Sequence, residues 1–409
     1  MRLFYFILLF VVILTCYRLH KDVLHPIILS CSFWFLFPLC YELLCLSNSR
    51  YWVLTDKFYY IISLYLIPFI FFTVFFIGDF TGRRRYTNIG NKVSTEKKVY
   101  IHNLINLCLI GNFLLIIRIF LLCHTFNIIS AISVFRVITT EKRYLITPDI
   151  TLLLYIFSIT PPLCCYIFLN KIKINRIKLI FFIIEFLIIT VLYVSKGRIM
   201  KYFIMIFAIL LLNRKLSLKI FLFGSIGIFG LVFSMTMIRD KNFMENFSFL
   251  DYMFVYFLSP LPAFDMLIND IVPYDIGPFG GRTLGFFYRV FVRLFGGTAP
   301  SYSKMFIGIP AKVGQVPTNV FTCFGSSYMD YGVFGLFIFG FFTALVFGSA
   351  YKKSFYLGKS EFIIFYILII YCLIFQFFGD FFFQFLSVPL QDLLCSYLVV
   401  RTIRTRIIK

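Results

Sequence analysis

Three arginines in the second half of the chain have a spacing that could serve phosphate chemistry. Arg282, Arg289 and Arg293 lie in the stretch 282–295, which has a Gly-Gly pair on each side. In a helix that turns by about 100° per residue, the three fall within about 40° of one another. A guanidinium stays charged and binds phosphate oxygens with a planar fork, so this predicted stripe suits a diphosphate. The alternative is an amphipathic helix at the membrane interface whose arginines reach lipid headgroups.

These arginines belong to a long connection, residues 239–322, in which the charges are segregated. The segment 239–275 holds six acidic and two basic residues, whereas 282–312 holds five basic residues and no acidic one. Long connections in compact bundles usually carry function. Because the second segment is also rich in Gly and Pro, we expect a turn-rich lobe around the predicted helix.

Two further basic segments could contribute to the same chemistry. Lys196 and Arg198 lie in a Ser-Lys-Gly-Arg sequence between two short apolar runs. Charges drawn into a membrane usually line a site, but an exposed hairpin turn explains these two equally well. Arg136 and Arg143 are seven residues apart in the segment 123–148, for which a solvated amphipathic segment is the alternative.

Asp330 precedes the apolar run 331–350. An acidic residue at a helix N-terminus is favourable for structural reasons, through capping and the helix dipole. In a transfer reaction the same carboxylate could orient or deprotonate an acceptor hydroxyl, with Asp275 and Asp251 as weaker candidates. Aromatic rings that could stack on sugar faces, and one amide, complete the candidate binding residues: Tyr288, Tyr302, Tyr328 and Asn319.

The composition indicates a membrane protein. Of the 409 residues, 61% are hydrophobic and 14% are charged, whereas soluble domains have about 25% charged residues. This excludes a soluble globular protein, a disordered chain and a disulfide-stapled secreted module. The net charge of +21 lies in short clusters between apolar runs, which fits a membrane surface better than nucleic acid.

The apolar runs predict the elements that position these residues. Only helices satisfy their own backbone in a hydrocarbon layer about 30 Å thick, so we expect an all-α polytopic bundle over residues 1–409. About 11 transmembrane helices are expected, with a range of 10–12. The runs are 3–17, 24–46, 58–77, 100–122, 149–170, 179–194, 199–212, 220–238, 330–350, 362–378 and 381–400.

Positive charge predicts the orientation of the bundle. Clusters at every second connection and at the C-terminus hold 22 of the 39 Lys and Arg residues, so the C-terminus is expected to be cytoplasmic. The connection 239–322 and the N-terminus then face outward. Four acidic residues lie in or beside apolar runs, where each could pair with an inward base such as Arg118, but the sequence identifies no specific pair: Glu42, Glu185, Asp380 and Asp392.

Familiar catalytic and cofactor motifs are absent from the sequence. There is no Walker A, GxSxG, HExxH or glycine-rich dinucleotide loop, and no DxD or ExD pair in an outer connection. The four His residues all precede residue 130. We therefore expect neither a cofactor nor a metal ion.

Three segments resemble the bacterial oligosaccharide repeat-unit (O-antigen) polymerases, the Wzy-type family. They are the Ser-Lys-Gly-Arg198 turn, the long outer connection rich in Arg, and the segment from Asn319 to Asp330-Tyr-Gly-Val-Phe-Gly335. The resemblance implies a GT-C-like helical bundle in the inner membrane. It also implies periplasmic glycosyl transfer between undecaprenyl-pyrophosphate-linked glycans, with functional arginines carried over onto Arg136, Arg143, Arg282, Arg289 and Arg293.

Two other functions remain open at this point. An O-antigen ligase, which transfers glycan to lipid A-core, shares the bundle and the long loop, but its members typically rely on a loop His that this loop lacks. A flippase of lipid-linked sugars would favour internal repeats, and none is found. The polymerase interpretation implies a chain-length regulator and a flippase of the same pathway as partners, and no nucleic acid.

Overall fold

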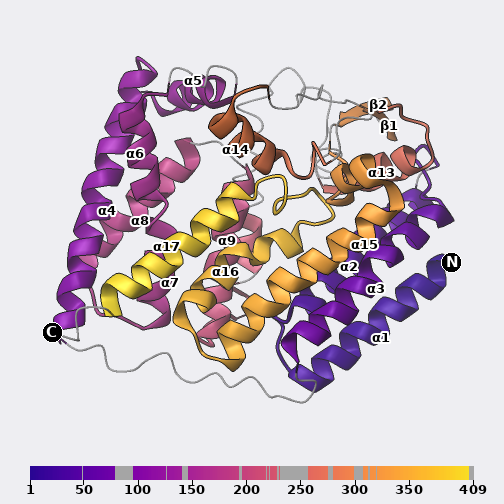
Figure 1. The fold of residues 1–409 in the computed structure, drawn as a ribbon, viewed down its shortest axis with the longest axis horizontal. Coiled ribbons are helices and arrows are strands. Elements are labelled where there is room, and N and C mark those ends of the chain that lie inside the picture. Colours follow the sequence, from indigo (N-terminus) through magenta and orange to yellow (C-terminus); the bar gives the residue numbers. More distant parts are fainter. Residues whose placement is uncertain are drawn as a thin grey trace. The chain divides into compact units, whose positions relative to one another are not determined.

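The computed structural model shows a helical protein that divides into two compact units, each described here by itself (Figure 1). The first unit comprises Met1–Arg85, Asn246–Leu357 and Cys372–Leu390, and the second comprises Tyr86–Glu245, Gly358–Tyr371 and Gln391–Lys409. The structure describes residues 1–47, 49–78, 95–125, 127–140, 146–192, 196–217, 219–220, 222–227, 230, 257–274, 280–298, 307–311, 314–318 and 320–404.

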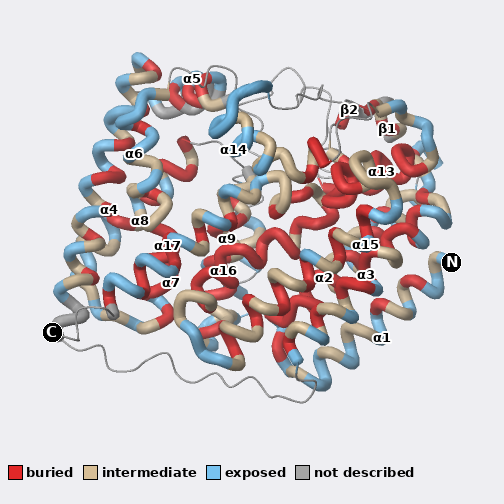
Figure 2. The backbone as a smooth tube through the Cα atoms, viewed as in Figure 1, coloured by how far each residue is buried: buried red, intermediate tan, exposed pale blue. Residues whose placement is uncertain are grey.

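The first unit is built on long apolar helices that lie side by side. These are α1 (Arg2–His20), α2 (Pro26–Ser47), α3 (Asp56–Ile77) and α15 (Phe324–Tyr351), which continues into a π-helical turn at Lys352–Tyr356. Large apolar and aromatic side chains of these helices are buried. The buried parts of the helices are red in Figure 2. The connection 239–322 adds α13 (Pro260–Ile268), α14 (Gly285–Phe295) and the strands β1 (Ile307–Ala311) and β2 (Gly314–Thr318).

The second unit contains the remaining helices of the described chain. Its helices α4 and α8 pack against each other, α4 packs against α6, and α9 packs against α7 and α8. The bounds are α4 (Thr95–Leu122), α5 (Ile128–Thr140), α6 (Pro148–Phe157), α7 (Thr160–Leu169), α8 (Arg176–Leu192) and α9 (Lys196–Leu212). Most of α16 (Ser360–Ile374) and of α17 (Ser387–Arg404) also belongs to this unit.

The structure confirms a helical membrane architecture in its coarse form. Each expected apolar run coincides with a helix or a pair of helices, except 220–238, most of which lies outside the described residues. Within the described residues, six helices are long and apolar enough to cross a membrane, which indicates a multi-pass protein. The count of about 11 spanning helices, the single bundle over 1–409 and the orientation stay predictions.

The connection 239–322 adds one β-hairpin that the sequence did not predict to the otherwise helical protein. Strands β1 and β2 pair antiparallel, with Ile307 opposite Thr318 and Ile309 opposite Val316. Ile307 and Ile309 are both buried, so their side chains share one face of the strand. This alternation of buried residues was the sequence signal for a strand. It covers only a few residues, and each strand contains a proline, Pro310 or Pro317.

Helices α3 and α15 approach closely because glycine occupies the contact. A Cβ atom at Gly340 would lie 2.7 Å from the Tyr65 carbonyl oxygen and 3.2 Å from Pro68 Cγ. Small residues at such positions let two helix backbones pack without a steric barrier, and packing drives helix association in lipid. The close contact fixes the position of α15, the helix that carries the candidate site residue Asp330.

Gly340→Ala is therefore expected to destabilise the protein by about 1–3 kcal/mol, since the new methyl group forces two backbones apart. The measurement is the thermal unfolding midpoint of the detergent-purified protein. Gly227→Ala is the matched control, because a Cβ at that helical glycine meets no atom within 4 Å. Equal midpoints for the two variants would contradict a tight α3–α15 contact.

Candidate functional site

The cationic helix predicted within 282–295 exists, but it is shorter than expected. Helix α14 begins at Gly285 and ends at Phe295, where the N–H of Gly296 donates to the Val292 carbonyl at 2.8 Å. Arg282 lies in the turn before the helix, so the prediction of a three-arginine stripe is wrong. The stripe consists of Arg289 and Arg293, which are one helical turn apart and exposed.

Asp330 holds the backbone of the turn that leads into α14. Its Oδ2 atom accepts hydrogen bonds from Thr283 N at 2.7 Å, Thr283 Oγ1 at 2.8 Å and Arg282 N at 3.0 Å. Hydrogen bonds to an ionised carboxylate are about twice as strong as neutral ones. The described residues thus connect Asp330 to the arginine lobe through two main-chain N–H groups and the Thr283 hydroxyl, and not through a guanidinium group. This contact fixes where α14 starts.

The glycines around Asp330 allow this close contact. Gly332 has φ 61° and ψ −148°, a conformation open only to glycine, and it breaks α15 into two parts. Asp330 lies in the part before the kink, whereas the sequence predicted that it opens the span; the helix begins earlier, at Phe324. Across the turn, Gly280 has φ +69°, and a Cβ there would lie 2.2 Å from Tyr331 Oη. The Asp-Tyr-Gly segment is therefore a docking point for the lobe.

A buried carboxylate, Asp265, ties the connection 239–322 to the first unit at a second point. Asp265 of α13 accepts hydrogen bonds from Trp52 Nε1 at 2.7 Å, Thr55 Oγ1 at 2.6 Å and Thr55 N at 3.1 Å. Asn269 Nδ2 donates to it as well, at 3.2 Å. Burial raises the pKa of the Asp265 carboxyl, and these hydrogen bonds oppose the rise. The connection 239–322 is thus fixed at two points, by Asp265 and by Asp330.

The aromatic candidates are placed only in part. Tyr288 lies on α14 and is half-buried, whereas Tyr328 lies on α15 and contacts Phe264 edge-on at 6.0 Å between ring centroids. Tyr302 and Asn319 lie outside the described residues, as do Asp251 and Asp275. Stacking of sugars on these rings stays a prediction.

The other predicted cations belong to the second unit. Lys196 and Arg198 lie in the first turn of α9, which begins at Lys196, and Arg198 is half-buried. Arg136 lies on α5, but its side chain and that of Lys196 are outside the described set, and Arg143 lies outside it altogether. Whether these cations act together with α14 stays a prediction.

The second unit contains a buried ion pair that the sequence did not predict as a pair. Lys201 Nζ lies 2.5 Å from Asp392 Oδ2, and both side chains are less than a tenth exposed. The Lys201 ammonium also lies 5.6 Å from the ring centroid of Tyr371. Arg118, the partner suggested for Asp392, instead contacts Asp149 at 2.6 Å on an exposed face. Glu42 pairs with Arg2 at 3.3 Å in the first unit.

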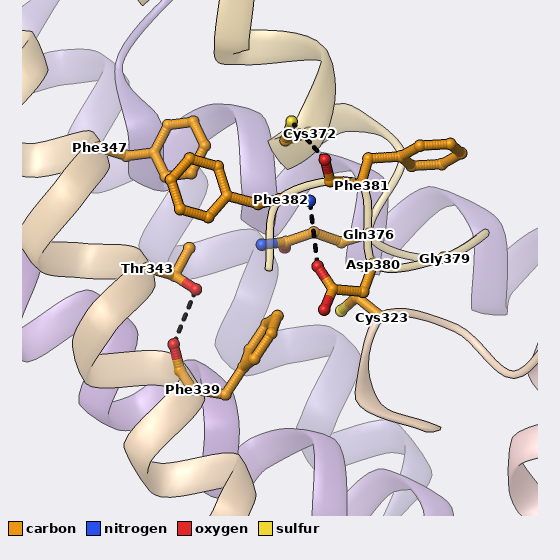
Figure 3. A pocket seen from close by; sticks show the side chains of 10 residues that line it. All are labelled: Cys323, Phe339, Thr343, Phe347, Cys372, Gln376, Gly379, Asp380, Phe381 and Phe382. Atoms are coloured by element: carbon orange, nitrogen blue, oxygen red, sulfur yellow. Dashed lines mark hydrogen bonds between the residues drawn. The ribbon is translucent and has the colours of Figure 1, made fainter. Parts of the chain in front are cut away.

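A small cavity in the first unit is built around Asp380, in the non-helical connection between α16 and α17 (Figure 3). The carboxylate accepts hydrogen bonds from the N–H groups of Phe382 at 3.0 Å, Phe383 at 2.8 Å and Gln384 at 3.2 Å. No ion pair with a base is found for it in the described chain; main-chain N–H groups hold it instead.

The polar side chains beside Asp380 are held by the surrounding helices. Gln376 accepts from Ser30 Oγ at 2.8 Å and from Trp34 Nε1 at 3.2 Å, and it donates to Tyr65 Oη at 2.6 Å. Such a network inside an apolar bundle rigidifies it, because each buried polar group has a partner. The cavity has room for a water-sized polar group. The polar side chains that line it are hydrogen-bonded to the surrounding helices, so we interpret the cavity as part of the structural core.

Among the described residues, the segment 280–295, which contains α14 and the turn before it, is therefore the best candidate for binding a substrate. It presents two exposed guanidinium groups from a helix whose start is fixed to a spanning helix. Within the described residues, no group of three His, Cys, Asp or Glu side chains is arranged to hold a metal ion. Comparisons with protein-family models, with curated proteins and with solved structures gave no match.

Proposed function

We propose that this chain is a glycosyltransferase of GT-C-like fold that polymerises oligosaccharide repeat units carried on undecaprenyl pyrophosphate. It would act on the periplasmic side of the bacterial inner membrane, with a chain-length regulator and a flippase as partners. The proposal draws on the resemblance of three segments to the Wzy-type polymerases. The observation that carries it is an exposed cationic helix, α14, whose start is tied by Asp330 to a spanning helix.

The proposed reaction is a substitution at the anomeric carbon of the growing glycan. A hydroxyl oxygen of the incoming repeat unit forms the new C–O bond and loses its proton to a base or to water. The bond between the anomeric carbon and the diphosphate oxygen breaks, and undecaprenyl pyrophosphate leaves with the electron pair. Because negative charge develops on the leaving oxygen, cations that are already in place lower the barrier.

Arg289 and Arg293 are proposed to bind that diphosphate. Their guanidinium groups are exposed, one turn apart, and the described part of 282–312 places no acidic side chain between them. A diphosphate can accept bonds from both forks at once, whereas a single cation satisfies one phosphate. Arg282 contributes through its position in the anchored turn, and Arg198 and Arg136 stay candidate contributors from the second unit.

Arg289→Ala and Arg293→Ala are each expected to reduce polymer synthesis by about one to two orders of magnitude. A hydrogen bond to a charged group contributes about 1.5–3 kcal/mol, and 1.36 kcal/mol corresponds to a tenfold rate change. The measurement is the lipopolysaccharide banding pattern of a deletion strain complemented with each variant. Single-repeat lipopolysaccharide should accumulate, and Lys at either position should restore only short ladders.

Arg118→Ala is the matched control, since Arg118 is an exposed arginine in the second unit that pairs with Asp149. It should give a normal ladder. Normal ladders from both α14 variants would overturn the proposal for these arginines. A strain that instead accumulates long lipid-linked glycan, with no repeat on the lipid A core, would identify a ligase, and a strain that retains unpolymerised units on the cytoplasmic side would identify a flippase.

A further inference from the structure

Helix α14 has an apolar face that the described part of the chain leaves exposed. Five large side chains on it are 40–73% exposed, and none of its residues is buried, as its mostly pale-blue course in Figure 2 shows. At about 100° per residue these five form one stripe, and the two arginines lie on the other side of the helix. The apolar stripe consists of Phe287, Val290, Phe291, Leu294 and Phe295.

The depth of α14 follows from its anchor on α15. The part of α15 after the Gly332 kink, residues 333–351, rises about 28 Å at 1.5 Å per residue. That length matches a hydrocarbon layer of about 30 Å, and Lys352 and Lys353 follow at the end that the distribution of positive charge predicts to be cytoplasmic. Asp330 therefore lies at the outer boundary of the hydrocarbon layer, and its bonds to Thr283 hold the start of α14 at that level.

The charge of the lobe matches the surface of a lipid leaflet. Residues 282–312 hold five basic residues and no acidic one, and the two on α14 are exposed on the side of the helix opposite the apolar stripe. Lipid phosphates carry the complementary negative charge. A helix with an exposed apolar stripe and a cationic side, held at the depth of the headgroups, meets the physical requirements for interfacial binding.

We propose that α14 lies in the outer leaflet of the membrane, with its apolar stripe among the acyl chains and Arg289 and Arg293 among the lipid phosphates. The occupant of the exposed face is thus the bilayer in which the protein is embedded. This inference does not depend on the proposed reaction. If both hold, the arginines meet only a diphosphate that is itself anchored in the membrane.

The test is fluorescence quenching in the full-length protein reconstituted into vesicles of phosphatidylglycerol and brominated phosphatidylcholine. Leu294→Trp adds a fluorophore to the stripe, and the signal of the parent, which has two Trp residues, is subtracted. The added emission should be blue-shifted, lose most of its intensity to brominated lipid and lose little to aqueous iodide. Phe295→Trp, at a position 73% exposed, repeats the test if the first variant does not fold.

Two control variants calibrate the quenching. Phe71→Trp lies on a spanning helix at a site 65% exposed and should report lipid, whereas Lys215→Trp lies in an exposed connection and should report water. Iodide quenching at 294 equal to that of Lys215→Trp would overturn the proposal, because the stripe would face solvent. Resistance to both quenchers would overturn it as well, since the stripe would then be covered by protein.

Discussion

Asp392→Asn is expected to lower the free energy of unfolding by about 3–5 kcal/mol, because it leaves the Lys201 ammonium buried without its counter-ion. The two side chains are 2.5 Å apart and less than a tenth exposed, and they join α9 to α17 across 191 residues of sequence. Water cannot replace the lost carboxylate in such surroundings. The measurement is the thermal unfolding midpoint in detergent, followed by intrinsic fluorescence.

The double variant Lys201→Met/Asp392→Leu separates the effect of the charge from that of the packing. It removes both charges and replaces them with apolar side chains of similar volume, so it should recover most of the lost stability. Asp149→Asn is the matched control, because it breaks a 2.6 Å ion pair that is nearly half exposed, and such pairs contribute about 0–1 kcal/mol. An unchanged midpoint for Asp392→Asn would show that the pair does not hold α9 to α17.

The Lys201–Asp392 ion pair could also affect the proposed reaction, because it lies next to Arg198. Arg198 is one helical turn before Lys201 on α9, and its charge also acts on the Asp392 carboxylate. A loss of the pair would therefore loosen the turn that carries Arg198. If Arg198 contributes to substrate binding, Asp392→Asn should weaken polymer synthesis more than its stability loss alone explains.

The helices could be predicted from the sequence because each depends on a local property. A run of apolar residues such as 58–77 must become a helix in lipid, whatever the rest of the chain does, and α3 occupies Asp56–Ile77. The short amphipathic helix that carries Arg289 and Arg293 could also be predicted locally, because Gly-Gly pairs flank a segment with a 3.6-residue period. Its first residue could not be predicted in this way.

What could not be predicted depends on contacts between residues far apart in the sequence. Arg282 fits the helical spacing, but its backbone is bound by Asp330, 48 residues away, and the helix begins only after that turn. The kink at Gly332 likewise follows the residues that contact the lobe at 280–283. It divides α15 into a part before and a part after Gly332, and the expected run 330–350 covers little more than the second part. The pairing of Lys201 with Asp392 could not be predicted either, because several acidic residues lie in or beside apolar runs and the sequence does not say which of them meets Lys201.

Asp330→Ala is expected to reduce polymer synthesis as strongly as the loss of an α14 arginine. The substitution removes the acceptor of three hydrogen bonds at 2.7–3.0 Å and so releases the turn at Arg282 and Thr283. Bonds to a charged acceptor contribute about 1.5–3 kcal/mol each, and the guanidinium groups of α14 can neutralise a leaving group only if they are held in place. The banding pattern of the complemented deletion strain measures the effect.

Asp330→Asn decides between an anchor and a proton acceptor. An amide oxygen still accepts hydrogen bonds from the backbone N–H groups of Arg282 and Thr283, but it cannot take a proton at neutral pH. If Asp330 is an anchor, Asp330→Asn should give a ladder of intermediate length and Asp330→Ala should give no ladder. If Asp330 is a general base, both variants should be equally inactive. Thr283→Val, which removes one of the three donors and keeps the carboxylate, should lie close to Asn under the anchor model and close to the parent under the base model.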